Sequence, residues 1–310
     1  MLNYFVYKES ALCCSVYMAT EDEEKEFPTV SLETDDSWKP EHLKKIRLLF
    51  PDSDRAIIVR GVLTPVECKR VIASIEKAGL TSLQKERGDE RYSSRNRVCN
   101  RTIMNDSAFS SLLETRLKDY ILPSLSISVN SSENDKTLPI KRNMAGDWHL
   151  DSVNPRWRGC RYDPGGFFAP HYDDGFSDGT RKTFVTIMTY LNTIKDGQGG
   201  RTCFWIDKNY ENVRDNTLGE PDECFCPQAG DVLLFYQHIM HKGERLDHGV
   251  KYMIRSDVLY KCIRPDVVPE KVAAAKKLVD EGNMLEAEGK IEAAIRCYSK
   301  AEVIDPDVWK

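Results

Sequence analysis

The sequence has no excess of basic residues, no long apolar run and no paired C-x-x-C elements. Acidic residues outnumber basic ones, 49 against 44, which gives 310 residues a formal net charge of −5. This balance does not favour nucleic acid as a partner. No stretch approaches the roughly 18–20 apolar residues that a membrane-spanning helix needs. Lys8 and Glu9 interrupt the apolar start, unlike a signal peptide. We therefore expect no nucleic-acid or membrane partner, and a cytoplasmic or nuclear protein.

The ten cysteines are scattered along the chain, so their spacing does not indicate a structural zinc site. Cys224 and Cys226 are too close for the usual zinc knuckle. A disulfide framework normally belongs to a shorter secreted chain. We predict free thiols in a reducing compartment.

The N-terminal part changes from an acidic segment to a regular pattern. Residues 1–50 show little periodicity, and we predict a loosely ordered segment. Residues 56–59 form a β-branched run typical of a buried strand. Thr64, Pro65 and Glu67 then form a helix start with a capping box, and Gly79 ends that helix. A second amphipathic helix is expected near 107–121, and a polar loop over 124–136.

From about residue 156 to 262, short apolar runs alternate with Gly, Pro, Asp and Asn. The candidate strands are 158–162, 183–191, 200–206, 230–236 and 250–260. Short strands with turns between them indicate a mainly β sandwich or barrel with flanking helices, rather than a sheet alternating with helices. Residues 265–310 are helical by composition. The predicted domains are therefore 1–50, a β domain at 51–264, and a helical pair at 265–310.

One short stretch, "FFAPHYDDGF", has the spacing of a metal site. Residues i and i+2 of a strand point to the same side, so His171 and Asp173 can reach one ion together. Two histidines and one carboxylate on iron leave open positions for a bidentate co-substrate and dioxygen. Asp174 is the wrong neighbour, because an adjacent strand residue faces the opposite side.

The third ligand has to come from a strand passing alongside. His238, His241 and His248 are the candidates. His238 is expected at the end of the preceding strand, and His248 lies only three residues before Lys251. His241, ten residues before Lys251, leaves room to turn a corner, so we choose it and expect it in the connection between two strands.

The ordered motifs resemble the iron(II)/2-oxoglutarate-dependent dioxygenases of the prolyl 4-hydroxylase type. They read, in chain order, "RYDPGGFFAPHYD", "RKTFVTIMTYLN", "GGRTCF", "PQAGDVLLF" and "HKGERLDHGVK". The resemblance covers roughly residues 55–262 and implies a double-stranded β-helix (jelly-roll) core. It assigns His171, Asp173 and His241 as catalytic metal ligands. It also implies Fe(II) as the metal, with 2-oxoglutarate and O2 as co-substrates.

The resemblance also implies residues that bind the co-substrate. Lys251 matches the cation that holds the distal carboxylate of 2-oxoglutarate. Tyr190, directly before Leu191, matches a tyrosine that shares this carboxylate, and Tyr162 lies where relatives place a pocket tyrosine. Arg255 lies four residues after Lys251 on the same strand face, and other branches use an arginine there. A guanidinium suits a bidentate carboxylate, so Arg255 is the alternative to Lys251 as the residue that binds the distal carboxylate.

The activity that the resemblance implies is hydroxylation of a C–H bond, with release of succinate and CO2. A prolyl residue in a protein or peptide is the expected acceptor, and ascorbate the expected reductant. An arginine-rich run at 90–102, which includes Arg95 and Arg97, could line a substrate groove.

The C-terminal segment offers a second function. Its sequence resembles one tetratricopeptide repeat, with the matching positions Gly282, Gly289, Ala293, Tyr298 and Ala301. A single repeat cannot bury its own apolar face. We expect a helix pair that packs on the barrel or binds a protein partner. The alternative is that this segment is the start of a longer repeat array. The rival hypothesis is therefore a catalytically silent barrel that acts as an interaction module through this tail.

Overall fold

The computed structural model describes most of the chain after residue 27. The described residues are 28–30, 34–48, 54–82, 96–127, 146–178, 180–206, 208, 210–264, 269–305 and 308–309. Most of the predicted segment 1–50, including its first 27 residues, lies outside them, as does Arg95. Contacts divide the chain into two compact units, Met1–Leu122 with Leu150–Tyr260 (unit 1) and Pro123–His149 with Lys261–Lys310 (unit 2).

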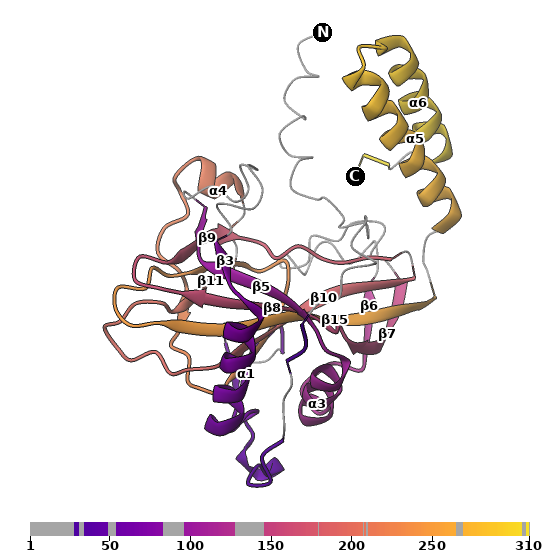
Figure 1. The fold of residues 1–310 in the computed structure, drawn as a ribbon. Helices are drawn as coiled ribbons and strands as arrows, with labels where there is room; N and C mark the ends of the chain where they lie inside the picture. The colour runs from indigo at the N-terminus through magenta and orange to yellow at the C-terminus, as the bar shows by residue number, and fades with distance from the viewer. Residues whose placement is uncertain are drawn as a thin grey trace. The chain divides into compact units, whose positions relative to one another are not determined.

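Unit 1 is built on two antiparallel sheets (Figure 1). The path through the major sheet is β1 (Lys44–Arg47), β2 (Ala56–Arg60), β13 (Val232–Tyr236), β10 (Arg181–Tyr190), β15 (Lys251–Arg264), β8 (Arg156–Tyr162), β5 (Asn100–Asn105) and β3 (Thr81–Ser82). The minor sheet runs β12 (Glu223–Phe225), β11 (Thr202–Trp205), β14 (Met240–Gly243), β9 (Phe167–His171) and β4 (Arg97–Val98). Phe204 of the minor sheet meets Phe235 of the major sheet, with ring centroids 5.4 Å apart. The predicted jelly-roll class, mainly β with flanking helices, is confirmed.

Helices cover one face of the major sheet. These helices are α1 (Pro65–Ala78) and α3 (Ser107–Leu117). The unit also contains two short helices, η2 (Pro40–His42) and α4 (Tyr210–Arg214). The capping box of α1 is present as predicted, because Thr64 accepts from the Glu67 amide and Glu67 accepts from the Thr64 amide. Phe109 of α3 packs on Trp157 of β8, with ring centroids 4.8 Å apart.

Strand β8 separates these helices from the interior between the sheets. Its odd-numbered residues face the helices: a Cβ on Gly159 would lie 2.8 Å from Ile75 of α1. Its even-numbered residues Arg158, Cys160 and Tyr162 line a pocket on the other side. The alternation of a strand therefore gives β8 two functions, one in packing and one in the pocket.

Unit 2 contains a strand pair and a helical pair. Strand β6 (Ser124–Ile127) pairs with β7 (Gly146–Val153). The predicted loop over 124–136 is thus wrong for its first four residues, where alternate side chains are buried. Residues 128–136 lie outside the described residues.

The helical C-terminal extension is present as α5 (Pro269–Ala287) and α6 (Ile291–Ile304). Tyr298 of α6 donates to Glu286 of α5 at 2.9 Å. A Cβ on Gly282 would collide with the Tyr298 ring, so glycine permits the close approach of the two helices. The tetratricopeptide-like character of this pair and the predicted domain boundaries stay predictions.

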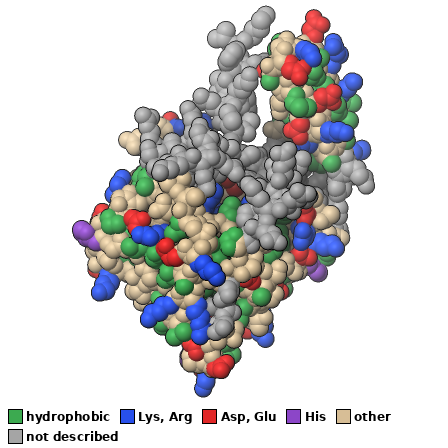
Figure 2. All heavy atoms as spheres, viewed as in Figure 1, with side chains coloured by type: hydrophobic (Ala, Val, Ile, Leu, Met, Phe, Trp, Pro, Cys, Tyr) green, Lys and Arg blue, Asp and Glu red, His purple; other side chains and the backbone are tan. Residues whose placement is uncertain are grey.

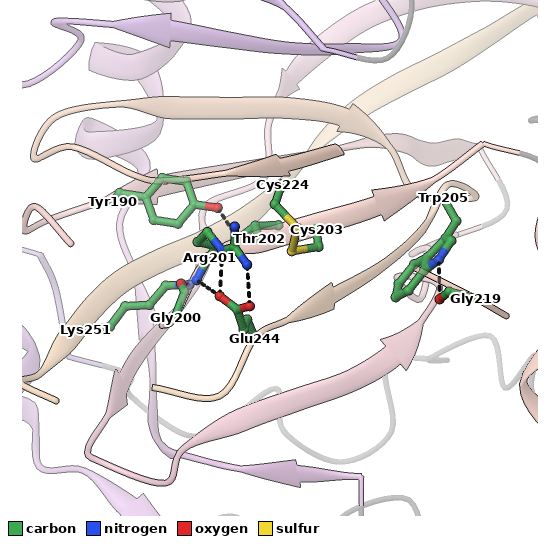
Figure 3. Close-up of a disulfide and its surroundings, with 10 residues drawn as sticks. All are labelled: Tyr190, Gly200, Arg201, Thr202, Cys203, Trp205, Gly219, Cys224, Glu244 and Lys251. Atoms are coloured by element: carbon green, nitrogen blue, oxygen red, sulfur yellow. Dashed lines mark hydrogen bonds and ion pairs between the residues drawn. A yellow bond between two sulfur atoms is a disulfide. The ribbon is translucent and has the colours of Figure 1, made fainter. Parts of the chain in front are cut away.

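The prediction of free thiols is wrong for two cysteines. Cys203 and Cys224 are directly opposite each other on β11 and β12 and form a disulfide (Figure 3). Their register could not be read from a separation of 21 residues. The free cysteines among the described residues are Cys68, Cys99, Cys160, Cys226, Cys262 and Cys297.

This disulfide gives a stability prediction. Closing a loop of 21 residues restricts the unfolded chain, so the Cys203→Ala/Cys224→Ala double variant should lose roughly 3 kcal/mol of unfolding free energy. Urea denaturation followed by fluorescence measures the loss. Cys226→Ala, which removes a half-buried free thiol two residues further on, is the matched control. Equal unfolding midpoints for the double variant and the wild type would contradict the prediction.

Candidate metal centre

Three side chains predicted as ligands come together between the sheets. His171 is the last residue of β9, and Asp173 follows two residues later. His241 lies on β14, directly opposite His171 in the pairing of β14 with β9. Their ligand atoms lie within 4.8 Å of one another. His171 Nε2 is 3.7 Å from Asp173 Oδ1, and His241 Nε2 is 3.8 Å from Asp173 Oδ2.

Two details differ from the sequence analysis. His241 lies within a short strand rather than in a connection between strands, so its position is fixed by pairing with both β9 and β11. Asp173 lies just beyond the end of β9, although it still faces the same ion site as His171. Asp174 is exposed and is not part of the group.

The backbone sets the tautomer of both histidines. His171 Nδ1 is 2.7 Å from the carbonyl oxygen of Ala169, and His241 Nδ1 is 2.9 Å from that of Ile239. A carbonyl oxygen only accepts, so Nδ1 carries the proton and each Nε2 has its lone pair free. Burial also lowers the pKa of both imidazoles and favours the neutral form.

The donor set fits a divalent first-row transition metal. His241 Nε2 is buried and has no hydrogen-bond partner among the described residues. Such an atom is costly to bury unless something binds it. Two imidazole nitrogens and a carboxylate converging on one point are the ligand set of non-haem Fe(II) oxygenases.

The Asp173 carboxylate is held from two sides. Thr186 Oγ1 donates to Oδ2 at 2.7 Å, and Arg255 Nη2 lies 3.2 Å from Oδ1. Burial raises the pKa of Asp173, but the Arg255 charge and the hydrogen bond from Thr186 outweigh it and hold that pKa below its usual range. Thr186 and Arg255 therefore keep the carboxylate charged and oriented.

Two cations on β15 face the same pocket but differ in their partners. Arg255 pairs with Asp173 and, at 3.2 Å, with Asp257. Lys251 is 4% exposed, and its Nζ donates to the carbonyl oxygen of Gly200 at 2.7 Å (Figure 3). Within the described part of the chain, no carboxylate forms an ion pair with Lys251.

Both predicted tyrosines flank Lys251. Its Nζ lies 5.4 Å from the ring centroid of Tyr190 and 5.7 Å from that of Tyr162. The Tyr190 hydroxyl shares a 2.7 Å hydrogen bond with Thr202 of β11, and burial raises its pKa. An ammonium group between two tyrosines, in a pocket that contains the His–Asp–His group, can bind a carboxylate.

The pocket also contains residues that the sequence analysis did not assign. They are Arg158, Cys160, Phe168, Met188, Thr202, Gly243, Glu244, Leu246 and Met253, besides Arg97, which was proposed only for a substrate groove. Alternation along the predicted strand at 158–162 would have placed Arg158 and Cys160 beside Tyr162. Arg97 carries no such signal, because it enters the pocket through the pairing of β4 with β9.

Comparison with known proteins agrees with this geometry. Residues 157–256 match the model of the 2OG-Fe(II) oxygenase superfamily. The match confirms the resemblance at the level of the superfamily, whose reactions use Fe(II), 2-oxoglutarate and O2. It spans the three candidate ligands, both β15 cations and both tyrosines. No curated protein matches the chain.

Among solved structures, three prolyl hydroxylases are similar to this chain. The viral collagen prolyl hydroxylase of Paramecium Bursaria Chlorella virus-1 is 16% identical, with 68% of this chain and 98% of that chain covered (TM-score 0.41). The Pseudomonas putida prolyl-4-hydroxylase is 13% identical, with 66% and 91% covered (TM-score 0.41). The Trichoplax adhaerens prolyl hydroxylase, solved with a hypoxia inducible factor peptide fragment, is 15% identical, with 69% and 86% covered (TM-score 0.43).

The exterior gives little further indication of function. Basic and acidic side chains are interspersed on the face that Figure 2 shows. In the part of the chain that the structure describes, no helix is both long enough and apolar enough to cross a membrane.

Proposed function

We propose that this protein is an Fe(II)/2-oxoglutarate-dependent dioxygenase that hydroxylates a C–H bond and releases succinate and CO2. The observation that carries the proposal is the convergence of His171, Asp173 and His241 on one point, with an orphaned buried Nε2 on His241. These three side chains would hold the metal. When bound, iron and 2-oxoglutarate supply the oxidising chemistry, and the protein supplies geometry and a shielded pocket.

We assign Lys251 as the anchor of the distal carboxylate of 2-oxoglutarate. Arg255 already pairs with Asp173 and Asp257, whereas Lys251 donates, among the described residues, only to a backbone carbonyl. A buried ammonium without a counterion is costly, and the co-substrate carboxylate would remove this cost. Tyr190 and Tyr162 would then enclose the carboxylate, and Arg255 would position the ligand Asp173.

For the acceptor, a prolyl residue in a protein or peptide is our proposal, with ascorbate as the reductant that restores iron. It rests on the motifs that resemble those of the prolyl 4-hydroxylase type. The pocket residue Arg97 stays a candidate for substrate contact, because its guanidinium packs on the Phe168 ring at 4.3 Å.

The deciding experiment measures succinate release from 2-oxoglutarate with Fe(II) and ascorbate. A proline-containing peptide library, read by the mass gain of one oxygen, identifies the acceptor at the same time. We expect succinate from the wild type and a gain of one oxygen on a subset of peptides. Failure of the protein to bind iron and to release succinate with any peptide would overturn the proposal.

The second candidate is a silent barrel that binds a protein through α5 and α6. Exposed apolar side chains on these helices favour it, since Met284, Ile291 and Ile295 are 63%, 51% and 55% exposed. An intact His–Asp–His group counts against it. Two results together would favour this candidate. The protein would bind metal but release no succinate, and the Ile295→Asp variant would no longer bind a protein partner that the wild type binds.

A pH dependence follows from the Lys251 assignment. Burial lowers the pKa of Lys251 to about 8, so the free protein loses this charge above that pH. Because a carboxylate binds the charged form, the KM for 2-oxoglutarate should be flat below pH 8 and rise about tenfold per pH unit well above it. Initial-rate measurements across pH provide the profile.

Lys251→Arg is the control for this pH profile, since a guanidinium stays charged throughout. The rise should disappear in that variant. A wild-type KM that stays flat up to the highest pH at which the protein remains folded would contradict the assignment.

A cytoplasmic or nuclear location is also a proposal. Disulfides persist mainly in oxidising compartments, so the Cys203–Cys224 pair weighs against it. Rapid alkylation of native cell extracts, followed by peptide mapping, would establish whether this pair is oxidised in the cell.

A further inference from the structure

Two thiols close to the candidate metal centre, Cys99 and Cys160, have no role in the proposed hydroxylation. Arg97 Nε is 3.0 Å from Cys99 Sγ, and Arg97 Nη2 is 3.3 Å from Cys160 Sγ. One edge of a single guanidinium therefore contacts both sulfur atoms. The same Nη2 donates to the Tyr162 hydroxyl at 3.2 Å. No carboxylate in the described part of the chain forms an ion pair with Arg97.

Strand register explains why the two thiols meet. Strands β5 and β8 are antiparallel, with Arg101 opposite Cys160 and Asn100 opposite Arg161. Cys99, one residue before β5, is therefore diagonal to Cys160, and both side chains point to the same side of the sheet. The Arg97 guanidinium contacts both sulfur atoms from this side.

The surroundings make the two sulfurs chemically unequal. A hydrogen bond from Cys99 and the nearby charge of Arg97 lower the pKa of Cys160, although burial opposes this. The same hydrogen bond raises the pKa of Cys99. Cys160 is therefore the more acidic thiol of the two, and a thiolate beside a cation such as Arg97 is the reactive form of cysteine.

Access to Cys160 is through the pocket. Cys160 is 1% exposed but lines the pocket wall, and Cys99 is 6% exposed. Only a small solute can reach them while the protein is folded. Cys68 offers a contrast: it is buried away from this pocket, and burial raises its pKa to about 12.

We propose that Cys99 and Cys160 are a redox-active thiol pair, which a peroxide converts into a disulfide. The Cys160 thiolate attacks one peroxide oxygen, the O–O bond breaks, and the leaving hydroxide takes a proton to become water. The Cys99 sulfur then attacks the resulting sulfenic acid, the S–O bond breaks, and a second water leaves with the Cys99 proton. Two thiols lose two electrons, and one hydrogen peroxide becomes two waters.

The oxidation changes the electrostatics of the site. The thiolate charge beside Arg97 disappears, while the Tyr162 hydroxyl and the Phe168 ring stay in contact with its guanidinium. Phe168 in turn stacks on the His171 ring, with centroids 3.4 Å apart. The pocket wall next to a candidate metal ligand therefore becomes more positive when the pair is oxidised.

The test uses the full chain, purified without reductant and treated with a graded series of hydrogen peroxide. The intact mass should fall by two hydrogens, and non-reducing peptide mapping should show a Cys99–Cys160 link beside the existing Cys203–Cys224 link. In Cys99→Ser the sulfenic acid on Cys160 should be trapped by dimedone. Arg97→Gln should slow that trapping about tenfold, because the cation no longer stabilises the thiolate.

Cys68→Ser is the control and should leave the link and the trapping rate unchanged. Circular dichroism checks that each variant is folded, and Cys160→Ser must abolish both signals. Peroxide treatment without a Cys99–Cys160 link, or dimedone labelling of Cys160 no faster than that of Cys68, would overturn the proposal. The readouts are masses, so they are independent of whether the protein is a dioxygenase.

Discussion

Asp173→Ala should abolish succinate release and weaken metal binding by more than about 100-fold, because altering only the partners of metal ligands already costs 10–100-fold. The loss should be this large because Asp173 is the only carboxylate in the candidate ligand group, and its two oxygens face both histidines. Binding of Mn(II), followed by its paramagnetic resonance signal, measures affinity separately from turnover.

The chain supplies its own control for this prediction. Asp174 is the next residue, carries the same charge and is exposed. Asp174→Ala should keep wild-type metal affinity and succinate release. If the two variants behaved alike, or if Asp173→Ala still bound metal normally, the assignment of the ligand group would be wrong. Circular dichroism has to show that Asp173→Ala is folded, since the variant removes the Asp173 ion pair of Arg255 and leaves its pair with Asp257.

Lys251→Met should raise the KM for 2-oxoglutarate by roughly 10–100-fold, which corresponds to a hydrogen bond with a charged group of about 1.5–3 kcal/mol. Metal affinity should stay near the wild-type value, because Lys251 forms no hydrogen bond or ion pair with the three candidate ligands in the described structure. Arg255→Met should do the reverse, lowering metal affinity through Asp173 while the KM changes little at saturating iron.

Lys242→Met is the matched control on strand β14. Its neighbour His241 faces the site, while the Lys242 Nζ lies 5.4 Å from the Trp205 ring centroid. This variant should change neither the KM nor metal affinity. If the KM for 2-oxoglutarate rose in Arg255→Met and stayed normal in Lys251→Met, Arg255 rather than Lys251 would be the carboxylate anchor.

Local patterns predicted most of the fold of unit 1. The capping box at Thr64 and the short β-branched runs depend on neighbouring residues, so the sequence shows them directly. The H-x-D pair is equally local. The choice of His241 depended on chain order and on the family resemblance, and its place inside a strand was missed because strand β14 is only four residues long.

The features that were missed depend on which strands pair, and in which register. Cys203 meets Cys224 only through the pairing of β11 with β12. Thr186, which donates to Asp173, lies thirteen residues away along the chain. Arg97 reaches the pocket through β4, a strand of two residues. None of these contacts has a periodic signal, because they connect distant segments at single points.

The two-sided role of β8 has a consequence for mutational studies of this protein. Enlarging Gly159 pushes on Ile75 of α1, and the resulting shift of the strand displaces Cys160 and Tyr162 on its other side. Substitutions under the helix and substitutions in the pocket are therefore coupled, and their effects should not add. Loss of activity on changing a residue beneath α1 does not show that the residue contacts the substrate.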